Sequence, residues 1–183
     1  MGVIHGAVRS SLWAASPVQH EWESEQLNRL LCEGASGERY ASMFWCYHDP
    51  HTHSLRYVNA GHCPPLLARK RDGGAEISRL DAGGPVLGIL PQAKYEQTTV
   101  EVSSGDVLVM YSDGLAEAAN ALGEEYGESR LRELLASLIE QSPDEIRRSV
   151  LASLAAFSGG SELQDDLTLV VAQFGSSTNA ALH

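Results

Sequence analysis

Long apolar runs, paired cysteines and an excess of basic residues are all missing from this sequence. No apolar run approaches the roughly 20 residues that cross a bilayer, and no signal peptide opens the chain. These absences predict a cytoplasmic protein without a membrane segment. Lys and Arg number 13 against 24 Asp and Glu. The net charge of −11 argues against a nucleic-acid binder, because phosphate contacts need a basic face.

Cysteines are few and show no metal-binding or pairing pattern. Cys32, Cys46 and Cys63 are odd in number and lack C-x-x-C spacing. Neither a disulfide framework nor a zinc ribbon is therefore supported, and we expect buried thiols that behave as small hydrophobic residues.

The composition indicates a globular protein, since 43% of the 183 residues are hydrophobic and 20% are charged. We expect one domain over residues 1–174 and a disordered tail over residues 175–183. The periodicity predicts helices over residues 3–15, 23–33, 131–139 and 143–157. It predicts strands over residues 40–48, 55–59, 65–69, 76–80, 95–102, 107–111 and 167–174, with a packed apolar loop over residues 83–90. The short connections favour antiparallel pairing.

The stretch VLVMYSDGLAE, residues 107–117, places an acid at the end of a buried strand. Local pattern alone favours Asp113 as a turn residue, because Asp-Gly is a common turn dipeptide. A second acidic pair, Asp165-Asp166, precedes the last predicted strand. If these two strands are neighbours in one sheet, the acids converge on one rim. Carboxylates in such a group are ligands that Mg²⁺ and Mn²⁺ prefer.

Two histidine-containing segments are weaker candidates. His48, Asp49, His51 and His53 cluster in a predicted hairpin turn and lack a zinc-finger or helical spacing, so we interpret them as turn residues. For the segment from Asn59 through Gly61 to His62, a turn with a solvated histidine and a functional role remain open.

The ordered motifs resemble those of the SpoIIE-type (RsbU-like) branch of the PPM metal-dependent serine/threonine protein phosphatases. The resemblance extends from about Leu27 to Phe174 and rests on the order and spacing of the motifs. These are Tyr40–Asp49, Leu55–His62 ending in NAGH, Pro64–Leu67, Gly84–Gly88, Gly105–Glu117 with YSDGLAEA, and Gln164–Val171 with QDDLTLVV.

The resemblance implies an α+β fold, in which two mostly antiparallel sheets are packed as a sandwich and flanked by helices. It also implies a centre of two Mn²⁺ or Mg²⁺ ions, with Asp113 and Asp165 as metal ligands. Asp166 and Gly114 are secondary candidates at the same centre. We place Asn59, Gly61 and His62 near the substrate.

The implied activity is hydrolysis of phosphoserine by metal-activated water, without a phosphoenzyme. The implied substrate is a phosphorylated STAS-type anti-sigma-factor antagonist in bacterial partner switching. The alternative is a non-catalytic regulatory or binding module with the same fold.

The chain departs from the family pattern at its beginning. Gly2–Ala7 resembles the end of the D-x-x-G-x-G motif, whose Asp bridges both metals, so that Asp would precede Met1. We therefore expect an N-terminally truncated domain that lacks the first strands, binds metal weakly and can be inactive. An uncovered sheet edge would favour a homodimer.

Overall fold

The computed structural model describes residues 20–34, 40–159 and 165–175. The expected helix over residues 3–15, the motif at Gly2–Ala7 and most of the predicted tail lie outside the described residues. The chain divides into two compact units, Met1–His62 with Asp81–Val100 and Cys63–Leu80 with Glu101–His183. We call these the first and the second unit. No helix in the described part is long and apolar enough to cross a membrane.

The first unit contains one helix and a mostly antiparallel sheet. Its elements are α1 (His20–Gly34), β1 (Met43–Asp49), β2 (Ser54–Ala60), β5 (Gly83–Gly84) and the start of β6 (Thr98–Glu101). The predicted hairpin is confirmed, with β1 and β2 in register from Met43 opposite Ala60 to Asp49 opposite Ser54. Helix α1 packs Leu27 and Leu31 against buried residues of this unit.

The predicted loop over residues 83–90 is partly a strand, because β5 pairs in parallel with β2. The sheet is thus mostly antiparallel, with one short parallel pair at this position. Gly83 explains the close approach, since an added Cβ would lie 1.9 Å from the Asn59 carbonyl oxygen. The rest of the loop is held by buried Asn28, whose side chain accepts from Gly88 N and donates to Leu90 O, both at 2.8 Å.

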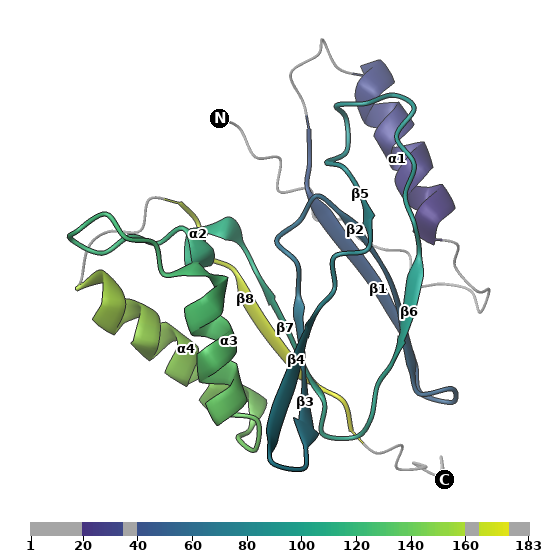
Figure 1. The fold of residues 1–183 in the computed structure, drawn as a ribbon. Coiled ribbons are helices and arrows are strands. Elements are labelled where there is room, and N and C mark those ends of the chain that lie inside the picture. Colours follow the sequence, from purple (N-terminus) through teal and green to yellow (C-terminus); the bar gives the residue numbers. More distant parts are fainter. Residues whose placement is uncertain (1–19, 35–39, 160–164, 176–183) are drawn as a thin grey trace, which may run out of the picture. The chain divides into compact units, whose positions relative to one another are not determined.

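The second unit is an antiparallel sheet with a pair of helices packed on it. The sheet order is β4 (Gly74–Arg79), β3 (Leu66–Arg71), β7 (Val107–Tyr111) and β8 (Leu169–Gln173). Helix α2 (Asp113–Ala116) follows β7, and α3 (Gly127–Ser137) and α4 (Pro143–Ser158) lie along the same sheet (Figure 1). Strand β7 is buried along Val107–Val109, at most 3% exposed, which explains its unbroken apolar sequence.

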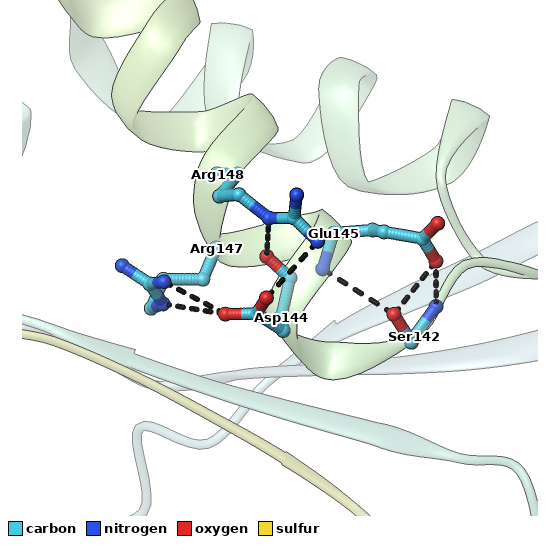
Figure 2. Close-up of polar contacts among 5 residues, drawn as sticks. All are labelled: Ser142, Asp144, Glu145, Arg147 and Arg148. Atoms are coloured by element: carbon cyan, nitrogen blue, oxygen red, sulfur yellow. Dashed lines mark hydrogen bonds and ion pairs between the residues drawn. The ribbon is translucent and has the colours of Figure 1, made fainter.

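The beginning of α4 confirms a local prediction in detail (Figure 2). Ser142 Oγ accepts from Glu145 N at 3.4 Å, and Glu145 Oε2 accepts from Ser142 N at 2.9 Å, which completes a capping box. Pro143 occupies the first turn, where a missing N–H costs nothing. Asp144 forms ion pairs with Arg147 and Arg148 on the next turn. Helix α4 therefore begins where the sequence predicts.

Three smaller expectations need correction. Strand β6 begins at Thr98 rather than at residue 95, and α3 ends at Ser137 rather than at residue 139. Cys46 is exposed rather than buried, because β1 is the outer strand of its sheet in the described chain. Cys32 and Cys63 are partly buried, and all three thiols are free.

Candidate metal centre

The pairing of β7 with β8 brings the two acidic segments together. The strands run antiparallel, and their ladder ends with Tyr111 opposite Leu169. The carboxyl end of β7 therefore lies beside the amino end of β8. Asp113 follows the first strand and Asp165-Asp166 precedes the second, so the predicted convergence of these segments is confirmed.

Gly114 lies in direct contact with the acidic pair. A Cβ added at Gly114 would lie 2.6 Å from the Asp166 carbonyl oxygen and 3.1 Å from that of Asp165. These distances exclude any side chain unless the backbone shifts. The glycine of the Asp-Gly dipeptide thus lets the two segments approach each other.

Ser112 is a residue of this site that the sequence analysis missed. Its backbone N donates to Thr168 O at 3.0 Å, and its Oγ donates to Asp166 O at 2.9 Å. The same Oγ accepts from Thr168 N at 2.9 Å. The motif around Ser112 served only to place Asp113, and the partners of Ser112 could not be read from it because they lie more than 50 positions along the chain.

The three aspartates are exposed, and the carboxylates of Asp113 and Asp165 each accept one bond from the backbone N–H of the next residue. Asp113 Oδ1 accepts from Gly114 N at 3.0 Å, and Asp165 Oδ1 accepts from Asp166 N at 2.8 Å. Acidic charge at this end also affects a nearby thiol. Burial raises the pKa of Cys63 most, and the charges of Asp113 and other acids raise it further. The charge of Asp113 therefore acts on the Cys63 thiol in the same unit.

The oxygen atoms at this site are of the chemical type that binds a hard divalent cation. Carboxylate and carbonyl oxygens are the ligands of Mg²⁺ and Mn²⁺, whereas structural zinc sites use cysteine and histidine. In the described ranges, no three His, Cys, Asp or Glu side chains form a group that could hold a metal. The role of Asp113, Asp165, Asp166 and Gly114 as metal ligands therefore stays a prediction.

The other candidates, Asn59, Gly61 and His62, lie at the end of β2 and directly after it in the first unit. Asn59 Oδ1 accepts from His62 N at 2.8 Å, and its Nδ2 donates to His62 O at 3.0 Å. Gly61 has a positive φ of 67°, and a Cβ there would lie 2.5 Å from Val86 Cγ2. These contacts account for a tight turn at the end of β2. Their placement near the substrate stays a prediction.

The histidine cluster spans the end of β1, with His48 and Asp49, and the β1–β2 turn, with His51 and His53. Asp49 Oδ1 accepts from His51 N at 2.9 Å, and this bond together with that from Thr52 N lowers the pKa of Asp49. His53 adopts a positive φ of 51°. The turn interpretation of this segment is confirmed.

Comparison with known proteins identifies the family. Residues 1–175 match the model of the family described as Stage II sporulation protein E (SpoIIE). Phosphoserine phosphatase RsbU of Bacillus subtilis is 28% identical over 147 residues, which is 80% of this chain but 43% of the relative. This chain thus spans less than half the length of that relative.

Solved structures share the fold. The SiaA-PP2C domain of Pseudomonas aeruginosa superposes with a TM-score of 0.69 at 20% identity, covering 84% of this chain and 58% of that one. The manganese-presoaked phosphatase domain of SpoIIE from Bacillus subtilis gives 0.65 at 21% identity, covering 89% and 69%. The predicted fold class and the resemblance to serine/threonine phosphatases are therefore confirmed, and the chain belongs to the SpoIIE family.

Proposed function

We propose that this chain is the phosphatase domain of a metal-dependent protein serine/threonine phosphatase. Its substrate is phosphoserine on a STAS-type anti-sigma-factor antagonist, and a homodimer is its expected assembly. The observation that carries the proposal is the β7–β8 pairing, which sets Asp113 beside Asp165-Asp166 at one end of the sheet. Membership of the SpoIIE family and the similarity to a phosphoserine phosphatase support the reaction class.

The chain's own residues hold and orient the reacting groups. Asp113, Asp165 and Asp166 would hold Mn²⁺ or Mg²⁺, two ions in the intact domain. A bound divalent ion supplies charge neutralisation for the phosphoryl group and an acidified water. Backbone N–H groups of Gly114 and Asp166 each occupy one carboxylate oxygen of the preceding residue. The side chains are thereby oriented, while their exposure leaves further lone pairs open to an ion.

Phosphate release from a phosphoserine-bearing STAS protein in the presence of Mn²⁺ tests the proposal. Asp113→Asn and Asp165→Asn should lower kcat/KM at least about 100-fold, because a metal centre supplies several kcal/mol of transition-state stabilisation. Asp72→Asn is the matched control, since this exposed acid lies between β3 and β4, at the other end of the same sheet. Measurable phosphate release that is equal for Asp113→Asn and the unchanged chain would contradict the proposal.

A second candidate is a regulatory module that binds the phosphorylated partner without hydrolysing it. The absence of a three-residue ligand group among the described residues favours this alternative. Binding of the phosphorylated STAS protein, with no phosphate released at saturating Mn²⁺, would establish it. Release that depends on Asp113 would exclude it.

A further inference from the structure

The hydroxyl of Ser112 does not cap helix α2, although Ser112 directly precedes that helix. Ser112 is the N-cap residue of α2, where a serine side chain normally accepts from a backbone N–H of its own helix. No such capping bond is present at Ser112. The hydroxyl instead bonds to Asp166 O and Thr168 N, both at 2.9 Å, in the segment that leads into β8.

Three hydrogen bonds therefore join Ser112 to the acidic segment. Besides the two hydroxyl bonds, Ser112 N donates to Thr168 O at 3.0 Å. Together they extend the β7–β8 connection beyond its last strand pair, Tyr111 with Leu169. The extension reaches the residues that carry the candidate metal ligands. We call this set of three bonds the Ser112 clip.

Gly114 completes the clip on its other side. A Cβ at Gly114 would approach the Asp166 carbonyl oxygen to 2.6 Å, the same oxygen that accepts from the Ser112 hydroxyl. The Asp166 carbonyl thus accepts a hydrogen bond from the residue before Asp113 and occupies the space that a side chain at the residue after Asp113 would need. Asp113 lies between these two residues in the chain.

We propose that Ser112 is a positioning residue that sets the spacing between Asp113 and the Asp165-Asp166 segment for cation binding. This inference rests on the proposed function. The hydroxyl bonds to Asp166 O and Thr168 N hold the backbone of the acidic segment beside Ser112, one position before Asp113. Removing a group that orients metal ligands lowers metal affinity about 10–100-fold. The reason is that each ligand must be held within about 0.5 Å of its productive position.

A role limited to stability would have a different signature. The Ser112 hydroxyl bonds are solvent-exposed, so water replaces them when the hydroxyl is lost and folding changes little. Water cannot replace the hydroxyl in setting the distance between the metal ligands. Removing the hydroxyl should therefore change Mn²⁺ affinity much more than the thermal midpoint.

The test is calorimetric titration of Mn²⁺ alone into four forms of the full chain, together with thermal unfolding of each. These are the unchanged chain, Ser112→Ala, Ser112→Thr and Ser137→Ala. Threonine keeps the hydroxyl on an extended backbone, with φ −83° and ψ 166° at Ser112. Ser137→Ala is the control because its hydroxyl also donates one exposed bond to a carbonyl, Leu134 O at 2.7 Å, away from the acids.

The expected result is a fall in Mn²⁺ affinity of about tenfold or more for Ser112→Ala, recovery in Ser112→Thr, and no change in Ser137→Ala. Equal affinities for Ser112→Ala and the unchanged chain would overturn the clip and leave the proposed function standing. Absence of Mn²⁺ binding by the unchanged chain would overturn the proposed function and the clip with it. Gly114→Ala is a second variant, and a loss of affinity in it without unfolding supports the same spacing requirement.

Discussion

Replacing Asp106 with alanine removes the buried half of an ion pair in the second unit. Asp106 is 3% exposed, and its Oδ2 accepts from Arg69 Nε at 3.0 Å and from Ser103 N at 2.9 Å. Arg69 lies on β3 and Asp106 immediately precedes β7, so their contact bridges two neighbouring strands. We expect Asp106→Ala to destabilise the sheet that carries Asp113.

The magnitude follows from the burial of the two partners. Breaking a buried pair costs about 3–5 kcal/mol, because the remaining charge is left without a partner. The Arg69 side chain is 22% exposed, so water can solvate part of its guanidinium group. Its terminal nitrogen also keeps a bond to Glu101 O. We therefore expect the lower end of the range, a loss of about 3 kcal/mol in the free energy of unfolding.

Urea unfolding followed by circular dichroism measures this loss as a shift in the midpoint. Glu76→Gln is the control, because it breaks the exposed Arg71–Glu76 pair in the same sheet and should leave the midpoint almost unchanged. A loss below about 1 kcal/mol for Asp106→Ala would refute the reasoning.

Three further changes test other parts of the structure. The Tyr95 hydroxyl is buried without a hydrogen-bond partner in the described chain, and burial raises its pKa to about 12, so Tyr95→Phe should keep or raise the thermal midpoint. Ser142→Ala should cost about 1 kcal/mol in urea unfolding. The Ser142 hydroxyl and N–H lower the pKa of Glu145, so this stabilisation is present above its ordinary pKa of 4.5 and is lost as the pH falls below that value. The effect of Ser142→Ala should therefore shrink in acid, and an effect that grows would contradict the capping box. Gly61→Ala should lower stability by about 1–3 kcal/mol in urea, because of its positive φ and its contact with Val86, and an unchanged midpoint would contradict this.

The sequence predicted features that depend on local patterns. Helix α4 was located from Ser142, Pro143 and Glu145, whose side chains and backbones act within one turn. Strand β7 was located from its unbroken apolar run. Such a run is needed because side chains on both faces of this strand are buried. The convergence of Asp113 with Asp165 needed only the assumption that two strands are neighbours.

Features that depend on distant partners were not predictable. Asn28 and Gly88 meet across 60 positions, and Asp106 meets Arg69 across 37. A buried polar residue of this kind resembles a surface residue until its partner is known. The Ser112 hydroxyl was missed for the same reason, because its partners Asp166 and Thr168 lie more than 50 positions along the chain.

Manganese-induced line broadening in the amide NMR spectrum tests the central claim most directly, because the paramagnetic ion broadens the signals nearest to it. The account predicts that Mn²⁺ broadens the amide signals of Gly114 and Asp166 first, and that Asp113→Asn removes the effect. The amide of Gly73, in the turn at the other end of the sheet, should stay sharp. Broadening centred on His51 in the β1–β2 turn, or broadening unaffected by Asp113→Asn, would contradict the account.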